Sequence, residues 1–322
     1  MQQLETAVGK SRTAQGTWLT KMKYKRYFWA YAFILPQAIL FFVLTLYPIV
    51  MSYVYSLFDW TGIGPINEFI GVANYTKLFQ DPLFWKSFRH TIEYIVGETI
   101  IVIPIGFILA VLLNNPKFKG RGFYRVLYFI PVVTTTAIVG VVMQLIFSNT
   151  NQGLVNTILL STHLSRQAIQ WLNSPVIAMV LAIVIGSWKY IGVVMVYWLA
   201  GLQTISEETY EAAELDGANR WQRMLFITLP MLKPISAVVL LFTIVNGMSA
   251  FDLIMTFTGG GPSFATQTLD VYVYNYAFNS SAVGGGLPQM GYASAGGVCL
   301  GIFVSMICLF IGGLVKLTNR DR

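Results

Sequence analysis

Residues 176–200 read VIAMVLAIVIGSWKYIGVVMVYWLA and contain a single charged side chain, that of Lys189. An α-helix rises about 1.5 Å per residue, so about 20 mainly apolar residues cross the roughly 30 Å hydrocarbon core of a bilayer. This stretch is long enough and apolar enough to do so. The sequence therefore predicts a membrane-spanning helix here.

The composition of the whole chain points to the same environment. Of its 322 residues, 55% are hydrophobic, 15% are aromatic and only 11% are charged, and the mean hydropathy is +0.62. Such a chain has too little polar surface to coat a soluble globular protein. We therefore expect an all-α membrane protein.

Six apolar segments are long enough to cross a bilayer. The predicted spans are 27–58, 92–113, 124–147, 176–200, 235–257 and 292–317. The first is longer than a bilayer requires and contains Pro36 and Pro48, so we expect a kinked or tilted helix there. The predicted organisation is a basic tail over 1–26, a transmembrane domain over 27–317 and a short tail over 318–322.

The Lys and Arg residues are unevenly distributed over the segments between these spans. The two tails and the loops after the second and fourth spans hold most of them, whereas the other side has only Lys77, Lys86, Arg89 and Arg166. Because cytoplasmic loops are enriched in positive charge, both termini are predicted to be cytoplasmic. The net charge of +7 thus reflects topology and contact with anionic membrane lipid, and we expect no nucleic-acid partner.

The loop after the fourth span, 201–234, is long and amphipathic. Ser206 is placed to cap a helix whose first turn contains Glu207 and Glu208, which suit the positive end of the helix dipole. Gly217 can adopt the left-handed conformation that ends this helix. A second short helix is predicted to follow and to close near Pro230.

This loop contains a pattern of fixed residues at fixed spacing. It starts with Glu211-Ala212-Ala213, and Gly217 follows after three further residues. Ile227 comes after nine further residues, and Leu229-Pro230 follows after one more residue. This spacing resembles the EAA signature of binding-protein-dependent ABC importer permeases at every fixed position. In that family the loop contacts an ATPase subunit. The resemblance assigns this contact here to Glu211, Ala212, Ala213, Asp216, Gly217, Ala218, Ile227, Leu229 and Pro230.

The resemblance extends over most of the chain and is greatest to the first permease of sugar importers of the maltose-transporter class. It implies a type I ABC importer permease fold in a bacterial or archaeal cytoplasmic membrane, and import of a sugar or oligosaccharide by alternating access. The implied partners are a second six-span permease chain, an ATPase dimer and an extracytoplasmic solute-binding protein.

The sequence contains no G-x-x-x-x-G-K-[ST] motif, so this chain has no ATPase site of that kind. We expect a transport subunit without a cofactor, with ATP and Mg²⁺ bound by the partner ATPase. His90 and His163 are isolated, and the sequence indicates neither a catalytic constellation nor a metal site.

Polar side chains inside predicted spans are costly and are functional candidates by default. We expect Glu98, Lys189, Asn246 and Asp252 to line a polar solute path, with Lys189 pairing with one of the acids. The alternative is that the charged residues form a structural ion pair or extend to the membrane interface.

Two further functions compete with sugar import. A permease for a sugar phosphate such as glycerol phosphate would look similar and would need a more basic path. A secondary transporter would have about twelve spans with internal repeats, whereas this chain has six predicted spans and no visible repeat. The loop 201–234 favours the importer.

Overall fold

The structure is a computed structural model and describes residues 27–66, 68–284 and 286–320, so the predicted tail 1–26 lies outside the described residues. Within these ranges the chain forms helices and, apart from one isolated bridge between Phe58 and Phe69, no β-structure. It divides into two compact units, residues 1–55 and 56–322. The first predicted span, except for residues 56–58, lies in the first unit, and the other predicted spans lie in the second.

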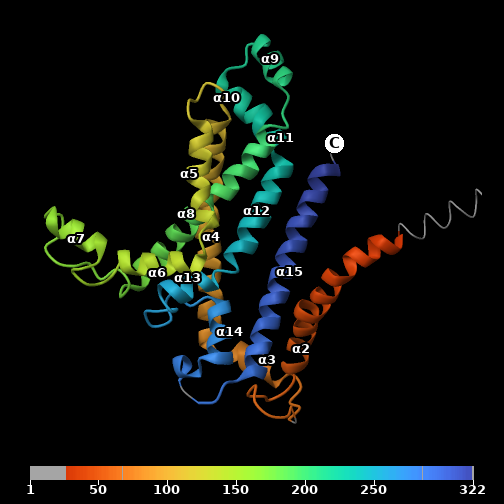
Figure 1. The fold of residues 1–322 in the computed structure, drawn as a ribbon, viewed down its shortest axis with the longest axis vertical. Coiled ribbons are helices and arrows are strands. Elements are labelled where there is room, and N and C mark those ends of the chain that lie inside the picture. The colour runs from red at the N-terminus through yellow and green to blue at the C-terminus, as the bar shows by residue number, and fades with distance from the viewer. Residues whose placement is uncertain (1–26, 67, 285, 321–322) are drawn as a thin grey trace, which may run out of the picture. The chain divides into compact units, whose positions relative to one another are not determined.

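The described part of the first unit is one long apolar helix, Tyr27–Tyr55. It contains a π-helical turn, η1 (Phe42–Leu46), in which the Tyr47 N–H bonds to the Phe42 carbonyl, and continues as α2 (Tyr47–Tyr55). Pro48 lacks an N–H group and its ring needs space against the preceding turn, which explains the wider turn at this point. The expected irregularity of the first span therefore appears as a π turn, and the helix is curved in Figure 1.

Three long helices of the second unit correspond to predicted spans: α4 (Pro82–Asn114), α8 (Pro175–Leu202) and α15 (Met290–Arg320). Helix α4 begins well before the predicted start at residue 92. Its start is set by Asp81, whose Oδ1 accepts a hydrogen bond of 2.8 Å from the Leu83 N–H, and by Pro82 in the first turn.

Two predicted spans are wrong as single helices. The segment 124–147 is divided into α5 (Arg121–Val133) and α6 (Thr136–Ile146), which meet at 94°. The segment 235–257 is divided into α12 (Lys233–Gly247) and α13 (Phe251–Phe257). The described chain thus has four helices suited to cross a membrane. It has up to six when each of two bent pairs is counted as one span: α5 with α6, and Arg220–Met231 with α12, which meet at 68°.

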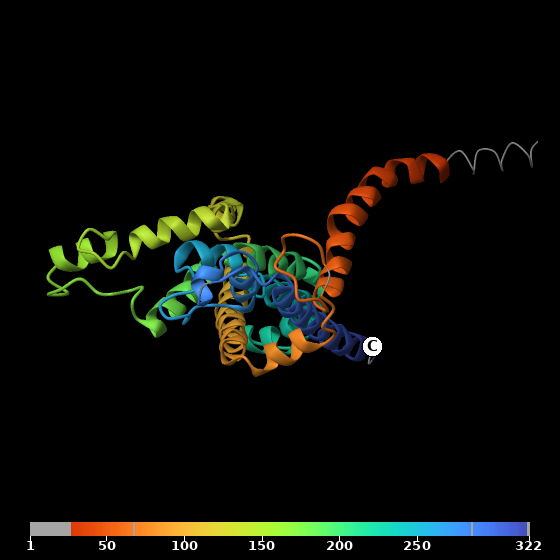
Figure 2. The same cartoon turned by 90° about the horizontal axis from the view of Figure 1, so that it is seen from below.

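The second unit also contains shorter elements. They are α3 (Ala73–Gln80), α7 (Leu154–Ser161), α9 (Glu207–Leu215), α10 (Arg220–Arg223), η2 (Met224–Thr228), α11 (Leu229–Met231), α14 (Leu269–Phe278) and η3 (Ser280–Val283). Helices α9 and α10 lie at one end of α4 and α8, and α3 and α14 lie at the other (Figure 1). Both views show α6 and α7 extending sideways from the bundle (Figures 1 and 2).

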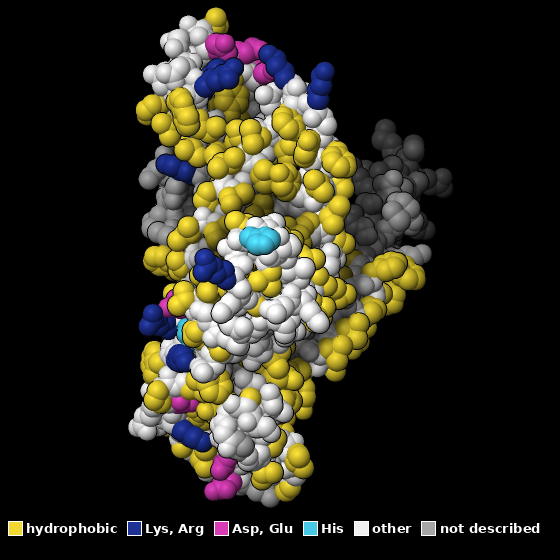
Figure 3. Space-filling model, turned by 90° about the vertical axis from the view of Figure 1, so that its left-hand side faces the viewer, with side chains coloured by type: hydrophobic (Ala, Val, Ile, Leu, Met, Phe, Trp, Pro, Cys, Tyr) yellow, Lys and Arg dark blue, Asp and Glu magenta, His cyan; other side chains and the backbone are white. Residues whose placement is uncertain are grey.

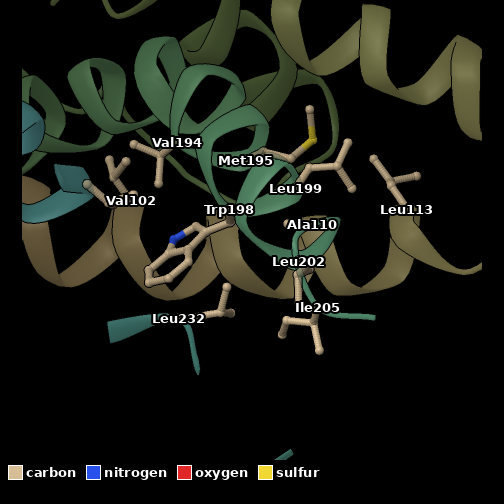
Figure 4. Packing of buried hydrophobic residues seen from close by; sticks show 11 residues of the cluster. Val102, Ala110, Leu113, Val194, Met195, Trp198, Leu199, Leu202, Ile205 and Leu232 are labelled. Atoms are coloured by element: carbon tan, nitrogen blue, oxygen red, sulfur yellow. The ribbon is translucent and has the colours of Figure 1, made fainter. Parts of the chain in front are cut away.

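The largest buried apolar cluster joins α4 and α8 and continues to the loop 201–234. Val102 and Ala110 of α4 pack with Val194, Met195 and Trp198 of α8, as Figure 4 shows. Ile205 and Leu232, near the two ends of the loop, belong to the same cluster. The base of the loop is therefore fixed to the long helices by apolar packing.

Helix α8 can approach α5 closely because residue 192 is glycine. A Cβ atom at Gly192 would lie 2.1 Å from the Tyr128 carbonyl oxygen, which is backbone and cannot rotate away. Gly192→Ala is expected to cost about 1–3 kcal/mol through overpacking and to lower the melting temperature of the purified protein.

Gly122→Ala in α5 is the matched control, because a Cβ atom there meets nothing within 4 Å. Its melting temperature should equal or exceed that of the wild type, since alanine favours a helix over glycine. Equal melting temperatures for the two variants would contradict the close α5–α8 contact.

A cluster of hydroxyl groups surrounds one carboxylate at the end that carries α3 and α14. Asp81 Oδ2 accepts hydrogen bonds from the hydroxyls of Tyr272 (2.6 Å), Tyr276 (3.2 Å) and Tyr292 (3.2 Å). Burial and the nearby Asp81 carboxylate raise the pKa of Tyr276 to about 12, so it keeps its proton and remains a donor. Asp81 thus joins the start of α4 to α14 and α15.

Asp81→Ala removes both the helix cap and the acceptor for three hydroxyls. We expect a loss of roughly 2–4 kcal/mol in unfolding free energy, measured as a lower melting temperature in detergent. Asp59→Ala is the control, because Asp59 is exposed. An Asp81→Ala variant as stable as the Asp59→Ala variant would show that the cluster does not stabilise the fold.

Candidate functional site

The loop 201–234, called the coupling segment below, contains the predicted first helix. Helix α9 (Glu207–Leu215) starts after Ser206 and ends before Gly217, whose φ of +80° is left-handed as predicted. Ser206 occupies the cap position, but its hydroxyl bonds to the Thr209 hydroxyl at 2.8 Å instead of capping the backbone.

The predicted second helix is a succession of short elements, α10, η2 and α11. It begins with a capping box in which Asn219 Oδ1 accepts from the Gln222 N–H and Gln222 Oε1 accepts from the Asn219 N–H. This box was not predicted from the sequence. The Asn-x-x-Gln spacing is a recognised start signal and could have located the helix start at residue 220.

Two contacts hold the halves of the coupling segment together. The Tyr210 hydroxyl bonds to the Thr228 hydroxyl at 2.9 Å, and Arg223 Nη1 forms a 2.7 Å salt bridge with Glu214 Oε2. Together with the buried Ile205 and Leu232 at its base, they make the segment a helical hairpin braced by internal contacts.

The coupling segment exposes three large apolar side chains. The side chains of Leu215, Trp221 and Phe226 are 89%, 77% and 75% exposed. Large exposed apolar side chains outside the predicted spans are candidates for contact with another protein. Charged side chains gather at the same end of the molecule, at the top of Figure 3.

The residues matched to the signature lie on this hairpin. Exposed members are Glu211, Ala212, Asp216, Gly217 and Leu229; half-buried members are Ala213, Ala218, Ile227 and Pro230. The small side chains at 212 and 213 leave the backbone of α9 accessible to close contact.

Lys189 is buried in α8, with 2% of its surface exposed. Its Nζ donates to the carbonyl oxygens of Pro131, Val132 and Thr134 at 3.3, 3.2 and 2.7 Å. These carbonyls end α5, where the chain turns by 94° into α6 and their helical partners are missing. The expected pairing of Lys189 with an acid is not found among the described residues, because the end of α5 supplies its acceptors.

The other three candidates for the solute path differ in how far their side chains are buried. Glu98 is 1% exposed in α4, and a Cβ atom on Gly247 of α12 would lie 2.8 Å from its Oε2. Asn246 is half-buried near the end of α12, and Asp252 is exposed at the start of α13. Asn246 and Asp252 therefore flank the break between α12 and α13, whereas Glu98 is enclosed beside it.

Comparison with known proteins decides the family. Residues 102–322 match the family model of the binding-protein-dependent transport system inner membrane component. This chain belongs to that family. It is therefore an integral membrane permease and a transport component.

Relatives of the permease match over most of their length. The lactose transport system permease protein of Rhizobium radiobacter is 35% identical over 85% of this chain and 90% of its own. The arabinooligosaccharides transport system permease protein of Bacillus subtilis is 35% identical over 89% of each chain.

The fold also matches a solved transporter. A permease chain in the crystal structure of a bacterial ABC transporter for import of the acidic polysaccharide alginate superposes with a TM-score of 0.76 at 24% identity. The match covers 91% of this chain and 96% of that one. The helical arrangement described above is thus that of an ABC importer permease.

Proposed function

We propose that this permease is one of two related chains of an ATP-driven importer for a sugar or oligosaccharide, and that its coupling segment docks on the ATPase. The observation that carries the proposal is the braced hairpin with its exposed Leu215, Trp221 and Phe226 beside the signature residues. An exposed apolar surface on a rigid segment is suited to receive motion from a partner.

The solute class follows from the relatives. Those described above are named for lactose and arabinooligosaccharides, and both align over nearly their full length. This supports a sugar over a sugar phosphate. The burial of Lys189 against backbone carbonyls points the same way, because it leaves this cation engaged and unable to attract a phosphate.

The proposed topology has six spans and both termini in the cytoplasm of a bacterial or archaeal cell, with α9–α11 on the cytoplasmic side. In this topology α5 with α6, and α12 with α13, each form one crossing. The partners in this proposal are a second six-span permease, an ATPase dimer that binds ATP and Mg²⁺, and an extracytoplasmic solute-binding protein. A related structure contains a periplasmic protein with bound alginate pentasaccharide, which supports the last of these.

For the solute path we favour Asn246 and Asp252, at the break between α12 and α13, over the enclosed Glu98 and Lys189. Polar side chains beside interrupted helices inside a membrane protein line cavities more often than they face lipid.

The first experiment is affinity purification of the chain from its native membrane, followed by mass spectrometry of the bound proteins. We expect an ATPase, a second permease and a solute-binding protein whose ligand names the sugar. Purification of the chain alone, with solute flux that needs no ATP, would refute the importer assignment.

Glu211→Lys tests the docking role of α9. It reverses an exposed charge in the signature and is expected to abolish solute-stimulated ATP hydrolysis by the purified complex while the chain still inserts. Glu208→Lys, an exposed change in the first turn of the same helix, is the matched control and should retain that activity. If both variants kept it, the contact would lie elsewhere.

A further inference from the structure

A cavity of about 510 Å³ lies beside the coupling segment, between the end of α4, the residues that follow α4, the end of α8 and α10–η2. Its lining includes the cations Lys117, Arg220 and Arg223 and the amides Asn114 and Asn115, and it includes no carboxylate. The site predicted from the sequence did not include this cavity.

The positive charge of the cavity is only partly balanced by the protein. Arg223 is paired with Glu214, whose side chain is 70% exposed and does not line the cavity. Lys117 and Arg220 form no salt bridge with any residue that the structure describes. Like charges that face one cavity repel one another, so a bound anion would stabilise this arrangement.

The neutral polar groups are arranged to donate hydrogen bonds. Asn115 Oδ1 accepts from the Lys117 N–H at 2.9 Å, which leaves the Asn115 amide NH₂ group available as a donor. Donors of this kind together with Lys and Arg suit the oxygens of a phosphate group.

Another part of the lining is apolar and comes mainly from the ends of the long helices: Val111 of α4, Leu202 of α8 and Met224, with Pro116. The hydroxyls of Tyr210 and Thr228, which bond to each other, also line the cavity. Helix α4 ends at Asn114, so the cavity lies where an apolar span meets polar residues. A ligand with a charged head and an apolar body fits both walls.

We propose that this cavity binds the phosphate group of an anionic phospholipid from the cytoplasmic leaflet. The choice of leaflet rests on the proposed function, which places α9–α11 in the cytoplasm. Lys117 and Arg220 contact the phosphate, and Val111 and Leu202 contact the glycerol and the first acyl carbons. The lipid thereby joins the coupling segment to the end of α4.

The test uses the purified transporter in detergent, phosphatidylglycerol as the probe and native mass spectrometry as the readout. Lys117→Gln with Arg220→Gln is expected to reduce bound phosphatidylglycerol roughly tenfold or more, since each basic residue near a lipid surface contributes about one order of magnitude or slightly less. Lys119→Gln with Arg121→Gln is the matched control: it removes the same charge from exposed residues outside the cavity and should retain the lipid.

Equal lipid retention in both double variants, or equal loss, would overturn the proposal. Millimolar inorganic phosphate separates the two sources of the anion: we expect it to leave phosphatidylglycerol bound, and full displacement would assign the cavity to a soluble phosphate. Lipid that binds the isolated chain but is absent from the complex with the ATPase would assign the cavity to the ATPase.

The proposed function is tested in a separate assay, which measures solute-stimulated ATP hydrolysis by the wild-type complex. Absence of solute-stimulated ATP hydrolysis would refute the importer assignment. The amount of bound lipid could still be interpreted, because it is measured without solute or nucleotide.

Discussion

Leu215→Asp combined with Phe226→Asp is expected to release the ATPase from the purified complex and to abolish solute-stimulated ATP hydrolysis. Both side chains are large, apolar and more than 70% exposed, so the substitution costs the isolated chain little. In the assembled transporter each would place a carboxylate in an apolar contact. Loss of two central contacts weakens association by roughly a hundredfold or more.

The readout is the amount of ATPase that co-purifies with a tagged permease, compared at equal permease yield. Leu164→Asp combined with Leu287→Asp is the control, since these leucines are 76% and 71% exposed outside the coupling segment. The control complex should keep its ATPase. Retention of the ATPase by the Leu215 and Phe226 variant would place the docking surface elsewhere.

Lys189→Met is expected to destabilise the permease by on the order of 3 kcal/mol or more. The substitution leaves three carbonyl groups at the end of α5 without their buried donor, in a region where water does not replace it. The expected results are a lower yield of monodisperse protein and a lower melting temperature. Lys189→Arg keeps donors in place and should recover part of the loss.

This experiment separates a positioning role of Lys189 from a role in the solute path. A path residue would give a Lys189→Met protein that folds normally and loses only solute transport. Lys86→Met is the control, because Lys86 also bonds to a carbonyl, that of Ser263 at 2.8 Å, but is exposed. Its melting temperature should stay near that of the wild type. A Lys189→Met protein as stable as this control would contradict the capping role.

The sequence was sufficient to predict those features of the structure that a local pattern of residues determines. The apolar run 176–200 predicted α8 to within a few residues, because the length of an uninterrupted apolar stretch sets the length of a spanning helix. Gly217 was predicted to end α9 because a left-handed residue strongly favours glycine. The spacing from Glu211 to Pro230 indicated the family, to which the matched region 102–322 assigns the chain.

Features that depend on direction or on distant partners were decided only by the tertiary structure. Hydropathy is the same for a straight helix and for one that turns by 94°, so the break between α5 and α6 could not be seen in 124–147. Lys189 appeared as a charge in need of an acid, because its acceptors belong to carbonyls more than 50 residues away that become free only at that break. Likewise, the three tyrosines bound to Asp81 are about 200 residues distant in sequence and meet it only through packing of α14 and α15 against α4. Composition and spacing thus determined the membrane environment, the family and the helix α9 that ends at Gly217. The packing of the helices decided which polar groups find partners inside the chain, because those partners are distant in sequence.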